Sequence, residues 1–270
     1  MLLKNKTAII YGAGGSLGST VAQTFAREGA YVFVTGRSEP SIKRVADQIV
    51  ANGDQASYAV VDALDEKAVN DHISEVVKTR GRIDISFNLV GLQDLQGIAL
   101  TDMKQEDYLR PVRIAMQTQF LTTTAAGRVM IRQGSGVILS LTATPGGMAY
   151  PLVGGFGPAC CAIEGYSRDL ASELGPKGVR VVNIRSAGSP DSRVFVEALS
   201  ENEGAADFVK KLEADTMLKR LPVMKDIASI ALMLASDLAA GITGTTIDVT
   251  CGTTEALNAN SKEIAFVYEK

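Results

Sequence analysis

The 270-residue sequence contains no tryptophan, a single histidine and three cysteines. The odd cysteine count, with Cys160 next to Cys161, is not a disulfide framework, and the sequence has no Cys-x-x-Cys motif or histidine cluster that could bind a metal. His72 lies in a polar helical stretch with Asp71 and Glu75, so we expect it on a solvated helix face. We therefore expect no metal site and a reducing, cytoplasmic setting.

Two further absences restrict the partners. Lysine and arginine total 27 against 30 aspartates and glutamates, so the chain carries a net charge of −3 and lacks the basic excess of nucleic-acid-binding proteins. No apolar run approaches the roughly 18–20 residues that span a membrane, and the first residues lack the apolar stretch of a signal peptide. We therefore expect a small-molecule ligand as partner, and neither nucleic acid nor a membrane.

Short apolar runs alternate with segments of helical pattern along most of the chain. The predicted strands are residues 7–11, 31–35, 57–61, 83–89, 136–141, 179–184 and 246–249. This alternation is typical of a parallel sheet, and continuous apolar runs indicate strands buried on both faces. The alternation predicts a single α/β domain with a parallel sheet, over residues 1–252. The polar helical segment 189–218 is predicted to be a lid beside the ligand crevice, and residues 253–270 form a C-terminal tail.

A glycine-rich turn with the sequence GAGGSLG, residues 12–18, follows the first predicted strand and precedes a helix predicted over 19–28. Glycines let the backbone turn tightly and approach a pyrophosphate, while a helix N-terminus supplies free N–H groups and partial positive charge. This context is typical of dinucleotide binding, although a strand-to-helix turn often needs glycine for structural reasons alone. We assign Gly12, Ser16, Leu17 and Gly18 to cofactor binding.

The end of the second predicted strand points to the type of dinucleotide. Arg37 follows this strand directly, where an acidic residue would bind the ribose hydroxyls of NAD. A guanidinium group suits a 2′-phosphate and can also stack on adenine. Arg37 therefore favours NADP over NAD as the cofactor, and the alternative is a solvated arginine at a helix entry.

Several motifs together resemble those of the short-chain dehydrogenase/reductase family. They are GAGGSLG at 12–18, VVD at 60–62, IDISFNLVG at 83–91, AIEGYSRDLASELGPKGVR at 162–180 and ITGTTIDV at 242–249. The resemblance implies a Rossmann-type doubly wound parallel sheet with helices on both faces, and an oxidoreductase with a nicotinamide cofactor. It assigns Asp62 to the adenine ring, and Asn88 and Gly91 to the adenosine ribose and the nearby backbone. The turn departs from the family pattern at Ser16, where the family has glycine.

The same resemblance implies a set of four reactive side chains, and here this sequence departs from the family. A tyrosine is the general acid/base, a lysine four residues later lowers its pKa, a serine polarises the substrate oxygen, and an asparagine holds a water of the proton relay. These positions fall on Phe156, Cys160, Ala143 and Ala115. Phenylalanine has no proton to donate, and cysteine supplies no ammonium charge. We therefore assign no catalytic residue.

Two classes of function stay open. The first is an oxidoreductase-like protein that binds NADP(H) with very low carbonyl or alcohol hydride transfer, or an enzyme that uses the pocket for a non-redox reaction. The second is a non-catalytic nucleotide- or metabolite-binding protein, or a partner subunit. Thr142, Thr144 and Tyr150 are the nearby hydroxyls that could replace the missing proton donor. The resemblance also implies a homodimer or homotetramer built on the helices that carry Ala115 and Phe156.

Overall fold

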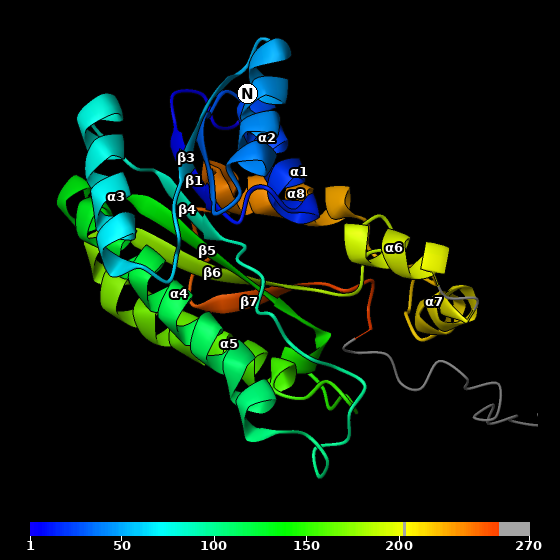
Figure 1. Cartoon of the computed structure of the whole chain (residues 1–270). Helices are drawn as coiled ribbons and strands as arrows, with labels where there is room; N and C mark the ends of the chain where they lie inside the picture. Colours follow the sequence, from blue (N-terminus) through cyan, green and yellow to red (C-terminus); the bar gives the residue numbers. More distant parts are fainter. Residues whose placement is uncertain (202–203, 254–270) are drawn as a thin grey trace, which may run out of the picture.

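A computed structural model of the chain describes residues 1–201 and 204–253, so most of the predicted tail lies outside the described residues. In this part of the chain, seven parallel strands form one sheet in the order β3-β2-β1-β4-β5-β6-β7 (Figure 1). The strands are β1 (Thr7–Tyr11), β2 (Tyr31–Gly36), β3 (Gln55–Val60), β4 (Ile85–Asn88), β5 (Gly136–Ala143), β6 (Val179–Ser186) and β7 (Thr245–Val249). The sheet is the predicted doubly wound one.

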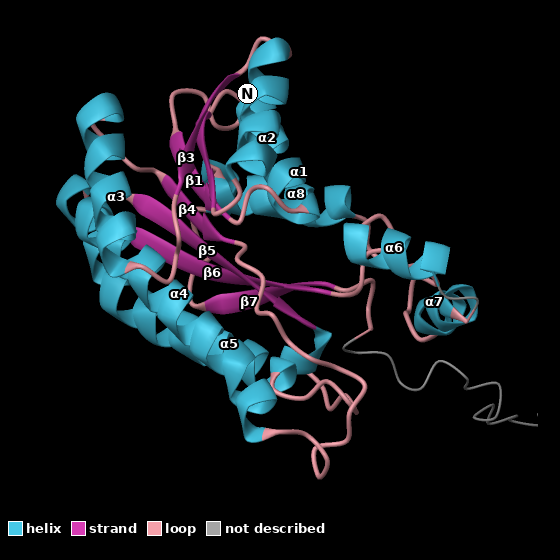
Figure 2. Ribbon diagram, in the orientation of Figure 1, coloured by secondary structure: helices cyan, strands magenta, loops and turns pink. Residues whose placement is uncertain are grey.

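Helices cover both faces of this sheet. They are α1 (Ser16–Arg27), α2 (Glu39–Ala51), α3 (Glu66–Arg80), α4 (Gln105–Gln133), α5 (Phe156–Leu174), α6 (Arg193–Glu201), α7 (Ala205–Ala214) and α8 (Met224–Ala235). Figure 2 shows α1, α2 and α8 on one face, α3, α4 and α5 on the other, and α6 and α7 apart from both layers. Among the described residues, none of the helices combines the length and apolar character that crossing a membrane requires.

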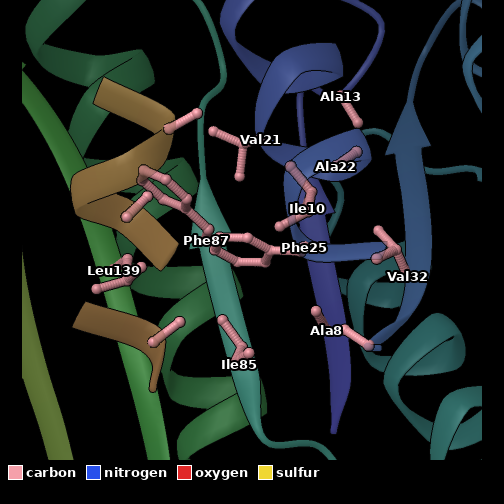
Figure 3. Packing of buried hydrophobic residues seen from close by; sticks show 14 of the residues in the cluster. Ala8, Ile10, Ala13, Val21, Ala22, Phe25, Val32, Ile85, Phe87 and Leu139 are labelled. Atoms are coloured by element: carbon pink, nitrogen blue, oxygen red, sulfur yellow. The ribbon is translucent and has the colours of Figure 1, made fainter. Parts of the chain in front are cut away.

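Two apolar cores lie on the two faces of the sheet. Ile10, Phe25 and Phe87 are fully buried in the core beneath α1 and α8 (Figure 3). The neighbouring Ile9 belongs to the opposite core, with Met130 of α4. Successive strand residues point to opposite faces, so the continuous apolar run of β1 follows from its place in the middle of a covered sheet. The expectation of burial on both faces is wrong for β3 and β7, which are partly exposed because they are the edge strands.

The first helix begins earlier than the sequence indicated. Gly15 is extended, with φ −81° and ψ 172°, and helical geometry starts directly at Ser16. Ser16, Leu17 and Gly18 therefore form the first turn of α1. The glycine-rich turn is thus shorter than the motif, and its serine stands at the helix N-terminus.

His72 corrects another expectation, because it is only 8% exposed and does not lie on a solvated face. It shares the inner face of α3 with Val69 and Val76, at the spacing of one helical turn, while Asp71 faces solvent. The imidazole packs edge-on against the Phe33 ring, with 5.7 Å between ring centroids. Burial lowers the pKa of His72 to about 4, so the folded protein holds it neutral.

We expect His72 to make the protein less stable as the pH falls from about 6.5 to about 4. In this window the unfolded chain binds a proton that the folded protein excludes, so the folding free energy from this residue is complete above the upper pH and is lost on acidification. The loss reaches about 3 kcal/mol. Urea denaturation of wild type and His72→Met across this range measures it. A wild-type profile that matches the variant would contradict the prediction.

Candidate functional site at the carboxyl ends of the strands

A cleft of about 1030 Å³ lies at the carboxyl ends of β1 to β4. Five of the predicted cofactor residues line it: Gly12, Ser16, Arg37, Asp62 and Gly91. Strand order reverses beside β1, whose neighbours are β2 and β4. Open α/β sheets bind ligands at this kind of switch point, beyond the carboxyl ends of the strands.

Two glycines of the turn after β1, Gly12 and Gly18, leave no room for a side chain. Gly12 has φ +74°, and a Cβ there would collide with the carbonyl oxygen of Leu89. A Cβ on Gly18 would collide with the carbonyl oxygen of Gly12. The turn therefore brings bare backbone and the N-terminus of α1 to the cleft, which fits a pyrophosphate. Leu17 does not line the cleft but packs against the core beneath α1.

Two arginines border the same end of the cleft. Arg37 follows β2, and Arg44 lies on the exposed face of α2. Ser38 and Ser41 lie beside them, with their hydroxyl oxygens 3.0 Å apart. Within residues 1–201 and 204–253, neither arginine has an acidic side chain at ion-pair distance, so both guanidinium groups are free to bind an anion. Arg44 was not predicted from the sequence. The only indication in the sequence is its place in the second turn of the helix that follows Arg37.

Asp62 and Asn88 are held by their own loops. An Asp62 oxygen accepts a hydrogen bond from the backbone N–H of Leu64 at 3.0 Å, which fixes the carboxylate at the cleft wall. Asn88 is buried, and its side-chain oxygen accepts from the N–H of Val90 at 3.0 Å. Its amide nitrogen faces the hydroxyl of Thr122 at 3.4 Å. Asn88 therefore shapes the loop after β4 and is not among the residues that line the cleft.

The four positions expected to carry the chemistry are apolar or weakly polar and largely enclosed. Ala143 ends β5, Phe156 begins α5, and Cys160 lies one turn further along that helix. Cys160 is 1% exposed, and burial raises the pKa of its thiol to about 12 although the backbone N–H of Ala143 contacts it. Ala115 is fully buried in a small apolar cluster with Ala159 and Ile163. This arrangement contains no group that can exchange a proton near neutral pH.

A buried polar network occupies the neighbouring space, and sequence reasoning missed it. Glu164 of α5 accepts hydrogen bonds from Arg185 of β6 at 3.0 and 2.7 Å and from the Thr142 hydroxyl at 2.9 Å. Asn183 donates to Thr142 at 2.7 Å. Glu164 and Arg185 expose only 7% and 14% of their side chains. The available signal was Glu164 directly after the apolar first half of α5, and Arg185 near the end of β6.

This network and its surroundings disfavour the candidate replacement acids. The Thr142 hydroxyl donates a hydrogen bond to the Glu164 carboxylate, so its proton is already engaged. Thr144 is buried in the short turn η1 (Thr144–Gly146). Tyr150 is half-buried, and burial together with the charge of Asp215 raises the pKa of its phenol. A proton donor for neutral pH needs the opposite shift.

Comparison with known proteins identifies the family. The family model described as Enoyl-(Acyl carrier protein) reductase matches residues 12–254. The chain is 28% identical to an uncharacterized oxidoreductase of Thermotoga maritima, over 94% of this chain and 99% of that protein. It is also 28% identical to the 3-oxoacyl acyl-carrier-protein reductase of Salmonella typhimurium, over 93% and 98%.

Solved structures agree in fold. A short-chain type dehydrogenase/reductase from Mycobacterium ulcerans has a TM-score of 0.86 at 24% identity, over 94% of this chain and 91% of that one. A gluconate 5-dehydrogenase from Burkholderia cenocepacia, in complex with NADP and tartrate, has a TM-score of 0.85 at 24% identity, over 94% and 97%. The match to nearly the whole length of sequence and fold places this chain in the short-chain dehydrogenase/reductase family.

Proposed function

We propose that the protein binds NADP(H) in the cleft and carries out ordinary carbonyl reduction or alcohol oxidation only very slowly. The nicotinamide cofactor, when bound, supplies or accepts the hydride, and the protein must then give or take a proton. The apolar character of Ala115, Ala143, Phe156 and the buried Cys160 carries this proposal. Loss of a general acid removes a contribution of roughly 10²- to 10⁴-fold in rate.

Two features of the cleft and one structural neighbour support nucleotide binding. The turn can approach a ligand as bare backbone, because side chains at Gly12 and Gly18 would collide with the neighbouring backbone. Arg37 and Arg44 provide two positive charges beside Ser38 and Ser41, as a 2′-phosphate requires. The structural neighbour from Burkholderia cenocepacia is itself an NADP complex.

We expect NADPH to bind at least about tenfold more tightly than NADH, because one charge-assisted hydrogen bond to the 2′-phosphate is worth that factor. Arg37→Gln should remove most of this preference while leaving the affinity for NADH nearly unchanged. Calorimetric titration of both cofactors measures the two affinities. Arg132→Gln, at the far end of α4, is the matched control and should leave both unchanged.

Two other outcomes would contradict the cofactor assignment. Equal affinities in wild type, or a preference for NADH, would show that Arg37 does not read the 2′-phosphate. Absence of binding for both cofactors would overturn the proposed function itself.

The second candidate is a non-catalytic nucleotide-binding protein or partner subunit. The observation that favours it is the hydrogen bond from Thr142 to Glu164. It engages the proton of the hydroxyl next to Ala143, so that this hydroxyl is not free to act as a donor. An assay that follows NADPH consumption with simple carbonyl substrates separates the two candidates. Saturable cofactor binding without consumption favours the binder, whereas slow but measurable consumption favours the residual enzyme. Conversion of the substrate without oxidation or reduction of the cofactor would indicate a non-redox reaction in the same pocket.

We also propose that α4 and α5 pair with the same helices of a second copy, giving a homodimer or homotetramer. Phe120 on α4 is 56% exposed, so its ring is accessible to a partner helix. We expect Phe120→Asp to lower the mass seen by light scattering at micromolar concentration while circular dichroism stays unchanged. A wild-type monomer under these conditions would contradict the proposal.

A further inference from the structure

A hydrogen bond attaches the segment predicted as a lid, residues 189–218, to the first turn of α1. The backbone N–H of Arg193, the first residue of α6, donates to the Ser16 hydroxyl oxygen at 3.0 Å. Ser16 is the first residue of α1, and 177 positions separate the two residues along the chain. Both residues line the nucleotide cleft. The lid therefore starts directly above the helix N-terminus that faces the cleft.

The charged side chains that line the cleft are unevenly placed. They are Arg37, Arg44, Asp62 and Arg193. Arg37 and Arg44 come from the end of β2 and from α2, whereas Arg193 comes from the lid beside the start of α1. In doubly wound folds, the pyrophosphate of a dinucleotide lies at the N-terminus of the first helix. The cleft thus offers positive charge at two separate places, one for the 2′-phosphate and one for the pyrophosphate of NADP(H).

The side chains of Arg193 and Ser16 are both available to an anion. Arg193 is 79% exposed and has Glu197 at 3.6 Å, one turn further along α6. An exposed pair of this spacing is worth only a few tenths of a kcal/mol, so the guanidinium leaves it at little cost. The Ser16 oxygen accepts from Arg193, and its own O–H can still donate because a hydroxyl does both. Within the described residues that proton has no other acceptor.

We propose that Arg193 and Ser16 together bind the pyrophosphate of the dinucleotide, and that this contact holds the lid over the bound cofactor. The inference rests on the proposed NADP(H) binding and adds residues outside the adenosine end. A side chain at Ser16, where the family has glycine, could also obstruct the cofactor. The inference instead gives this side chain a role in binding. Glycine at this position lets bare backbone approach the cofactor. With serine, the hydroxyl instead contacts both the lid and a phosphate.

Two ligands separate this site from the 2′-phosphate site. Adenosine 2′-monophosphate carries the 2′-phosphate without a pyrophosphate, whereas NADPH carries both. Calorimetry should show that Arg193→Gln weakens NADPH binding about tenfold or more and leaves adenosine 2′-monophosphate unchanged. Arg193→Lys should restore part of the affinity. Lys210→Gln, which removes one exposed charge from the same lid, is the matched control and should bind NADPH like wild type.

The serine is tested by two substitutions. Ser16→Ala and Ser16→Gly should both weaken NADPH binding several-fold, because each removes the hydroxyl, and thermal melting without cofactor verifies that both variants fold. Tighter binding by Ser16→Gly would show that the side chain obstructs the cofactor and would overturn the inference. NADPH affinity that is unchanged in Arg193→Gln would overturn it as well, while leaving NADP(H) binding intact. Failure of wild type to bind NADPH would overturn the proposed function and this inference together.

Discussion

Arg185→Met should lower the free energy of unfolding by about 3–5 kcal/mol, the cost of removing one partner from a buried ion pair. Arg185 is 14% exposed, and two of its nitrogens donate to the Glu164 carboxylate. Without the guanidinium, Glu164 is left as a buried charge with the Thr142 hydroxyl as its remaining donor in this network. Urea denaturation monitored by circular dichroism measures the loss.

A double substitution separates the ion pair from simple packing. In Glu164→Leu with Arg185→Met, both charges are gone and side chains of similar length fill the space. Because Glu164 is then no longer left as a buried charge, the double variant should recover most of the stability lost by Arg185→Met. The contact of Arg185 with the partly exposed Asp248, at 3.3 Å, is lost in both variants and does not affect this comparison. Losses that simply add would mean that the two side chains act independently, and the network would not be the stabilising unit.

The network also has consequences for the site. Glu164 lies beneath η1, where a side chain on Gly146 would collide with its carboxylate. It also lies one turn from Cys160 on α5. The ion pair therefore fixes the connection between β5, which ends at Ala143, and α5, which begins at Phe156. Buried charges therefore hold the backbone beside two of the four positions where the family resemblance places reactive side chains.

The sequence was sufficient for the features that depend on local pattern. Apolar runs of strand length, separated by helical segments, defined a parallel sheet, and the strand–glycine–helix arrangement located the cleft. Edge strands could not be recognised, because β3 and β7 read like central strands until their neighbours are known. The polarity of the segment around His72 suggested solvent, yet only its inward-facing neighbours Val69 and Val76 decide its burial.

The site was predicted less completely, because its contacts join residues far apart in the sequence. Glu164 and Arg185 are 21 positions apart, and only the packing of α5 on β6 brings them together. Ser16 and Arg193 meet because the start of α6 lies against the first turn of α1. Asn88 fits the family motif, but its side chain is used by the neighbouring loop. The motifs assigned Ser16 and Asn88 to the site but not Glu164, Arg185 or Arg193, and only the fold gives the partners of all five.

If the proposed function holds, introducing the four side chains of the family's usual set should raise a very slow reduction to a measurable rate. The variant combines Ala115→Asn, Ala143→Ser, Phe156→Tyr and Cys160→Lys. It restores a proton donor, the ammonium that lowers its pKa, a donor to the substrate oxygen and the relay residue. We expect NADPH-dependent reduction of simple carbonyl substrates to rise by roughly 10²- to 10⁴-fold, the usual contribution of general acid–base catalysis.

The partial variants and the folded state are the controls for this experiment. Phe156→Tyr alone should gain little, because a phenol without the neighbouring ammonium keeps its high pKa and groups that act as a unit are not additive. Ala115 and Cys160 are buried, so the larger side chains cost stability, and a cooperative thermal transition must be verified. Robust reduction by wild type would contradict our interpretation of the site. Its proton would then come from an unassigned group, and loss of activity in Tyr150→Phe or Thr144→Val would identify it.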